Sequence, residues 1–140
     1  MIGKLALAVF LSLAAAAAHA QDKPGLFVNL ASGDSWRGWM ALHFAHMTLR
    51  QGHPVTVFLN LDAVKLAAPA LPQEKRPSMM RTPIEILPEL VRDGAVVLVC
   101  GPCLGEFGLT LEKLVPGLKL GAPGLTQSYL FDKDVRVLSW

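Results

Sequence analysis

The stretch that decides the fold reads AVVLVCGPC and runs from Ala95 to Cys103 of a 140-residue chain. Its first six residues are apolar throughout, which predicts a strand of a parallel sheet that is covered on both faces. Pro102 follows closely, and proline is favoured in the first turn of a helix. We therefore expect a strand that ends at Cys100 and a helix that begins at about Pro102 and carries Cys103 in its first turn.

Strands of a similar kind alternate with helices along the rest of the chain. Apolar and β-branched runs predict further strands at residues 25–30, 55–59, 118–120 and 135–140. Apolar spacing and capping signals predict helices at residues 35–51, 63–66, 83–92, 102–115 and 126–131. This alternation is typical of a single α/β domain with three layers, α/β/α, and a mostly parallel sheet.

Two apolar rows cover much of the predicted helix at residues 35–51. One row holds Trp36, Met40, Phe44 and Met47, and the other holds Trp39, Leu42 and Leu49. We expect the two tryptophans to lie in the core or at a subunit interface.

A proline-rich segment precedes the predicted helix at residues 83–92. Residues 67–81 contain three prolines and several charged residues, which predicts a mobile loop that could act as a lid or docking surface. Thr82, Pro83 and Glu85 then form a capping box with proline at the first helical position, which marks the start of the helix.

Residues 1–20 have the pattern of a signal peptide. Lys4 supplies a positive charge, an uncharged apolar run follows, and Ala18-His19-Ala20 is a small-x-small cleavage signature. The run is shorter than the roughly 20 apolar residues that a membrane span needs. We expect cleavage after Ala20 and a single periplasmic domain at residues 21–140, with an uncleaved anchor as the alternative.

Charge and glycine usage exclude several classes of partner. The formal net charge is +2 at pH 7 and loses one unit when Lys4 is removed, so the basic stripe of a nucleic-acid binder is not expected. No second long apolar run follows residue 20, so no membrane association is expected after cleavage. Gly33 stands alone after the first strand, without a phosphate-binding loop, and we expect no nucleotide or other cofactor.

Cys100 and Cys103 are the candidate reactive residues. In an open parallel sheet, ligands and reactive groups gather beyond the carboxyl ends of the strands, where Cys100 is expected. Unpaired N–H groups and the positive end of the helix dipole favour a thiolate at such a position. We expect Ser32, Asp34, Asn60 and Asp62 to collect at the same edge, because they follow the first two predicted strands.

Cys-Gly-Pro-Cys is also the thioredoxin tetrapeptide, but its context here differs. Two strand–helix units precede the motif, and the residue before Cys100 is Val99, where thioredoxins usually have a tryptophan. Pro116 and Pro123 do not stand in the hairpin setting of the thioredoxin cis-proline. The order of elements therefore argues against a thioredoxin.

Three stretches instead resemble the DsrE/DsrF-like family of small sulfur-handling proteins. Residues 41–59 are similar to its first helix, glycine turn and second strand, and residues 60–67 to the turn into a short helix. Residues 94–104 match its strand and Cys-Gly-x-Cys segment, which is the most specific of the three. The closing residues 137–140 also fit the family.

The resemblance implies a fold and a function. It implies a parallel sheet of about five strands between helices, and homo-oligomers that are often trimers or hexamers. It also implies that Cys100 takes the position at which relay members carry sulfur as a persulfide, with Cys103 as the extra cysteine of the Cys-Gly-x-Cys branch.

The leading interpretation is a periplasmic sulfur-relay or thiol-redox protein that acts as a sulfurtransferase-like carrier of sulfur. Cys100 is then the nucleophile or persulfide bearer, and Cys103 is the resolving thiol that releases or passes on the sulfur as a disulfide forms. Its partner is a sulfur donor or acceptor protein or a small sulfur compound.

Two alternatives stay open. One is a non-catalytic oligomeric binding module in which the cysteine pair is a local structural disulfide or two inert thiols. The other is a copper or zinc protein, in which His43 and His46, spaced by three residues, or Met79 and Met80 add ligands to the cysteines. A zinc site usually needs four ligands, and the chain contains only one cysteine pair, so we assign no metal-ligating residues.

Overall fold

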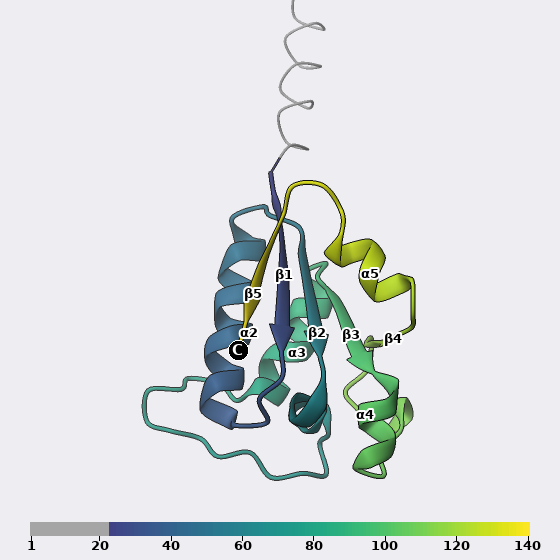
Figure 1. Cartoon of the computed structure of the whole chain (residues 1–140). Coiled ribbons are helices and arrows are strands. Elements are labelled where there is room, and N and C mark those ends of the chain that lie inside the picture. The colour runs from purple at the N-terminus through teal and green to yellow at the C-terminus, as the bar shows by residue number, and fades with distance from the viewer. Residues whose placement is uncertain (1–22) are drawn as a thin grey trace, which may run out of the picture.

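A computed structural model describes residues 23–140, so the expected signal peptide lies outside the described residues. The described chain forms one five-stranded sheet with the strand order β4-β3-β2-β1-β5, in which every strand pair is parallel (Figure 1). Within residues 23–140 no helix combines the length and apolarity that crossing a membrane requires. The expected α/β fold with a parallel five-stranded sheet is confirmed.

The elements follow the predicted order closely. The strands are β1 (Gly25–Leu30), β2 (Val55–Leu59), β3 (Val96–Cys100), β4 (Lys119–Gly121) and β5 (Val135–Ser139). The α-helices are α2 (Ser35–Arg50), α3 (Pro83–Arg92), α4 (Gly101–Glu106) and α5 (Leu125–Leu130), and two short 3-10 helices are η1 (Leu61–Ala67) and η2 (Leu111–Lys113).

One face of the sheet packs against α2 and α3 and forms the main core. Side chains alternate along a strand, and the parallel register brings Leu26, Val28 and Leu30 of β1 onto the same face as Val57 and Leu59 of β2. All five are buried and belong to one core cluster with residues of α2 and α3. Figure 1 shows these two helices behind the sheet.

The opposite face carries the alternate residues, and among the elements of residues 23–140 the helix that covers it is α5. Phe27 and Leu98 are buried there, whereas Asn29, Phe58 and Cys100 are only half-buried. The α5 helix has six residues, so it covers less of the sheet than the 16-residue α2 covers on the other face. The sheet is therefore packed densely on the α2–α3 face and thinly on the α5 face.

Both predicted helix starts are present. The carboxylate of Asp34 accepts a hydrogen bond of 2.8 Å from the backbone N–H of Arg37 and caps α2. At α3, Glu85 accepts from the backbone N–H of Thr82 at 2.6 Å and also from its hydroxyl group. These two bonds lower the pKa of Glu85.

The buried side of α2 differs from the predicted apolar rows. It consists of Gly38, Ala41, Leu42, Ala45 and His46. Met40, Phe44 and Met47, which the spacing placed in one apolar row, are exposed. Small residues face inward because η1 lies close to the helix: a Cβ atom on Gly38 would stand 2.5 Å from a methyl group of Leu66.

The predicted helix at residues 102–115 is wrong beyond its first turns. The α4 helix ends at Glu106, and Gly108 adopts a positive φ of 61°. The N–H groups of Gly108 and Leu109 donate to the carbonyls of Gly105 and Leu104, which is the Schellman arrangement of a helix end. The leucines at 111 and 114 that extended the helical spacing lie in η2 and just after it.

The proline-rich loop between η1 and α3 is anchored at several points. The side chain of Gln73 donates to the carbonyl of Leu66 at 2.7 Å and accepts from the N–H of Ile84 at 3.1 Å. Met79 is buried, and the guanidinium of Arg76 lies over the ring of Trp36. The loop thus runs along the N-terminal end of α2, and its mobility stays a prediction.

Candidate functional site

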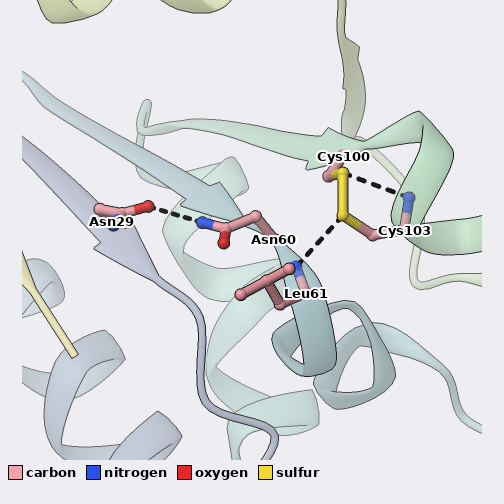
Figure 2. The surroundings of a disulfide bond; sticks show 5 residues. All are labelled: Asn29, Asn60, Leu61, Cys100 and Cys103. Atoms are coloured by element: carbon pink, nitrogen blue, oxygen red, sulfur yellow. Dashed lines mark hydrogen bonds between the residues drawn. A yellow bond between two sulfur atoms is a disulfide. The ribbon is translucent and has the colours of Figure 1, made fainter.

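Cys100 and Cys103 form a disulfide at the carboxyl end of β3. Cys100 is both the last residue of the strand and the N-cap of α4, and its Sγ accepts a hydrogen bond of 3.2 Å from the backbone N–H of Cys103. Both cysteines are half-buried and rest against the edge of the core. The predicted pair is therefore brought together at the predicted edge of the sheet (Figure 2).

A second backbone donor reaches the site from the neighbouring strand. The N–H of Leu61, two residues beyond β2, donates to Sγ of Cys103 at 3.2 Å. Leu61 has a φ of 47°, in the left-handed region that costs a non-glycine residue about 1–2 kcal/mol. Its N–H points to the sulfur, and N–H donors stabilise a sulfur anion once the disulfide is reduced.

Two asparagine side chains extend the site across the ends of β1 and β2. The amide of Asn60 donates to the side-chain oxygen of Asn29 at 2.5 Å, and Asn29 donates to the hydroxyl of Ser139 on β5 at 3.4 Å. Leu59 pairs with Val99, so Asn60 and Cys100 are next in register. Figure 2 shows the row from Asn29 through Asn60 to the disulfide.

Sequence reasoning predicted Asn60 at this edge but missed Asn29 and Leu61. Asn29 could have been found as the one polar residue inside the apolar run of β1. Leu61 carried no signal, because its contribution is a backbone N–H, which every residue except proline has.

The other residues expected at this edge have local roles. The hydroxyl of Ser32 accepts from the N–H of Asp34, which caps α2, and Asp62 pairs with Lys65. Lys65 also lies over the ring of Phe107, 4.6 Å from its centroid. Among the hydrogen bonds of residues 23–140, none joins these side chains to either sulfur.

The histidines considered as metal ligands have other partners. His46 is 2% exposed, and its Nε2 lies 2.7 Å from a carboxylate oxygen of Asp93 at the end of α3, with Glu89 3.8 Å from Nδ1. The hydrogen bond with His46 is the main cause of the lowered pKa of Asp93. His43 stacks on Trp39, with 5.2 Å between ring centroids.

The methionines are also separated. Met79 is buried, and its sulfur accepts from the N–H of Arg76, whereas Met80 is 75% exposed. In the part of the chain that the structure describes, no three His, Cys, Asp or Glu side chains gather in an arrangement that could hold a metal ion.

Comparison with curated proteins finds two archaeal relatives of unknown activity. Over 84 residues the chain is 39% identical to the uncharacterized protein MJ0989 of Methanocaldococcus jannaschii. These residues cover 60% of this chain and 70% of that protein. Over 84 residues it is 33% identical to the uncharacterized protein MK0008 of Methanopyrus kandleri, covering 60% of this chain and 66% of that protein.

Comparison with solved structures and with protein families agrees on the fold. The crystal structure of the ychN protein from E. coli superposes with a TM-score of 0.67 at 19% identity, covering 84% of this chain and 99% of that one. The model of the DsrE/DsrF-like family matches residues 23–138, nearly the whole described chain. On this match, the chain belongs to the DsrE/DsrF-like family.

Proposed function

We propose that the protein is a sulfur-relay or thiol-redox protein that carries sulfur as a persulfide on Cys100, with Cys103 as the resolving thiol. Membership of the family points to a sulfur-relay or related function. The observation that carries the finer proposal is the disulfide between two half-buried cysteines at the carboxyl end of β3. Backbone N–H groups of Cys103 and Leu61 contact the two sulfur atoms.

The first step loads sulfur onto the reduced protein. The Cys100 thiolate attacks the outer sulfur of a donor persulfide, R–S–SH. A bond forms between Sγ and that sulfur, the donor S–S bond breaks, and R–S⁻ leaves. The product is a persulfide on Cys100. Donor and protein taken together are neither oxidised nor reduced in this step.

The second step unloads it. The Cys103 thiolate attacks Sγ of Cys100, the disulfide forms, and the outer sulfur leaves as hydrosulfide. The protein is then oxidised by two electrons and the sulfur is reduced by two. A small dithiol or a dithiol reductase must return the protein to its reduced form, and the disulfide seen here corresponds to the state before that reduction.

A structural disulfide is the second candidate, and the packing of both cysteines against the core favours it. Its stabilising effect is limited, because a bridge across three residues closes a very short loop. The chain-entropy relation gives about 2 kcal/mol for a loop of this size.

The test is sulfur loading of the reduced protein, followed by intact mass and sulfide release. After incubation with polysulfide, the wild type is expected to release sulfide and to return to the disulfide. Cys103→Ser is expected to retain the mass of one added sulfur atom, and Cys100→Ser to gain none. If all three proteins stay unmodified with several donors, the structural disulfide is the better account.

For the location, we propose the periplasm. The support is the pattern of residues 1–20, with Lys4, the apolar run and the Ala-His-Ala cleavage signature. Fractionation of expressing cells and N-terminal sequencing test it. A mature N-terminus at Gln21 in the periplasmic fraction is the expected result, and an intact chain in the cytoplasm would overturn it.

We also propose that the protein forms homo-oligomers through α2. Met40, Phe44 and Met47 on this helix leave 41%, 46% and 44% of their surface exposed, and the ring of Phe44 packs near Trp140 at the end of the chain. A row of large apolar side chains on one helix is typical of a subunit contact. Phe44→Glu is expected to shift the wild-type oligomer to monomer in light scattering, and an unchanged mass would contradict this interface.

A further inference from the structure

A cavity of about 350 Å³ lies between α5 and the sheet, on the face to which the alternation of side chains along β3 assigns Cys100. Phe27 and Phe58 line it from the sheet, Leu130 from α5 and Val137 from β5. The two phenyl rings contact each other with their centroids 6.5 Å apart. The cavity exists because the short α5 helix covers the sheet only in part.

Phe58 connects the cavity to Cys100. Its Cε2 atom lies 3.0 Å from the position that a Cβ atom on Gly121 would take. Phe58 is on β2 and Gly121 is on β4, with β3 between them, so the ring must cross over β3. Cys100 is the β3 residue that pairs with Gly121, and the ring therefore lies beside Cys100.

The polar groups of the cavity are neutral. They come from Asn29, Thr126, Gln127 and Ser139, and among residues 23–140 no charged side chain lines the cavity. Asn29 also hydrogen-bonds to Asn60, which is next to Cys100 in the register, so a row of polar side chains leads from the cavity toward the disulfide. An ionised group inside such a cavity would lose its hydration without gaining a counter-ion.

From this arrangement we infer that the cavity binds the organic group of the small sulfur compound that reacts at Cys100, and that this group is uncharged and apolar. The inference rests on the proposed function, since it assigns the substrate class of the same cysteine. It favours a neutral organic persulfide or thiosulfonate over thiosulfate or a donor with an anionic organic group. The apolar part would lie on Phe27 and Phe58, with its sulfur directed toward Cys100.

A pair of thiosulfonates that differ by one carboxylate group tests the selectivity. The reduced Cys103→Ser protein is treated with benzyl or 4-carboxybenzyl methanethiosulfonate, and the rate is followed by mass. The Cys100 thiolate attacks the sulfur that bears the benzyl group, a mixed disulfide forms, and methanesulfinate leaves. The neutral reagent is expected to react about tenfold faster, after correction for the rates with a free small thiol.

Two variants on the edge strand separate the cavity from general effects. Val137→Trp fills the cavity and is expected to remove the preference for the neutral reagent. Leu138→Trp is the matched control, because Leu138 is the next residue and points to the opposite face. Equal rates in the starting protein, or a preference that survives Val137→Trp, would overturn the inference.

An unreactive ligand separates this inference from the proposed function. Benzyl methyl sulfide is titrated into the oxidised wild type, and the side-chain amide signals of Asn29 and Gln127 are followed by NMR. Saturable shifts that Val137→Trp abolishes support the cavity even if Cys100 accepts no sulfur. Loading of Cys100 by polysulfide without such shifts would keep the proposed function and overturn the inference.

Discussion

The two faces of the sheet are formed by the same strands but differ in how tightly they are packed. On the α2–α3 face, Val28, Leu30, Val57 and Leu59 are all fully buried, and two long helices cover them. On the α5 face, one six-residue helix leaves a cavity of about 350 Å³ and a half-buried Cys100. The difference indicates that tight packing is concentrated on one face, and we propose that the other face binds and reacts.

The same contrast separates the two polar clusters. His46 is buried between α2 and α3 and joins Asp93 and Glu89 in contacts that fasten the helices together. Cys100 and Cys103 are half-buried residues, and within residues 23–140 the hydrogen bonds to their sulfurs come from backbone N–H groups. We interpret the first cluster as a contact that stabilises the packing of α2 against α3. We interpret the second as a site that a sulfur donor or acceptor can reach.

The largest expected effect on stability comes from a substitution that leaves a cavity on the α2–α3 face. Leu59→Ala removes a fully buried side chain and is expected to lower the free energy of unfolding by about 2–5 kcal/mol. Val137→Ala, on the thin face and 49% exposed, is expected to change it by less than about 0.5 kcal/mol. Urea denaturation measures both, and similar losses would break the distinction between the faces.

Loss of the His46 contacts is expected to have an intermediate effect on the free energy of unfolding. His46→Ala removes a buried side chain together with its hydrogen bond to Asp93, and is expected to lower the free energy of unfolding by about 1–3 kcal/mol. His43→Ala is the control, since His43 is only half-buried and stacks on Trp39. Denaturation in which the control loses as much as His46→Ala would show that the cluster does not fasten α2 to α3.

Reduction of the disulfide is expected to cost less than the loss of a core side chain. The closed loop is so short that the expected loss is about 2 kcal/mol or less. Urea denaturation with and without a reductant measures it, and the double variant Cys100→Ser, Cys103→Ser should not respond to the reductant. A loss as large as that of Leu59→Ala would favour a structural role.

The smallest expected effect is the pH dependence that comes from Asp93. Its pKa lies below the ordinary value of 3.8 because of the hydrogen bond with His46. A lowered pKa contributes stability above the unfolded-state value, and that stability is lost as the pH falls through the folded-state value. The difference in stability between the wild type and Asp93→Asn should therefore shrink below about pH 4. A difference that grows in acid would contradict the sign.

Much of the fold could be predicted because its signals are local. The apolar run that ends at Cys100 and the capping box at Thr82 both depend on residues that are adjacent in sequence, and both are present in the structure. The helix after Cys100 was predicted too long, because leucines at helical spacing continue beyond Gly108. The left-handed conformation of that glycine ends the helix.

The site could be predicted only in part for a related reason. Cys100 could be placed because it ends a strand, but the donor from Leu61 is a backbone N–H whose direction depends on how the chain turns after β2. The place of Asn29 depends on the pairing of β1 with β2 and β5, which the sequence does not state. The ring of Phe58 on β2 reaches Gly121 on β4 across β3, and no sequence pattern predicts this contact.

The most direct test of the central claim is to locate the sulfur that the folded, reduced Cys103→Ser protein takes up from polysulfide. Peptide mapping by mass spectrometry is expected to find one additional sulfur atom on the peptide that contains Cys100. The same protein, denatured before exposure, provides the control for intrinsic reactivity. If the denatured chain is loaded while the folded protein stays unmodified, Cys100 is closed to donors in the native structure, and the proposed role is wrong.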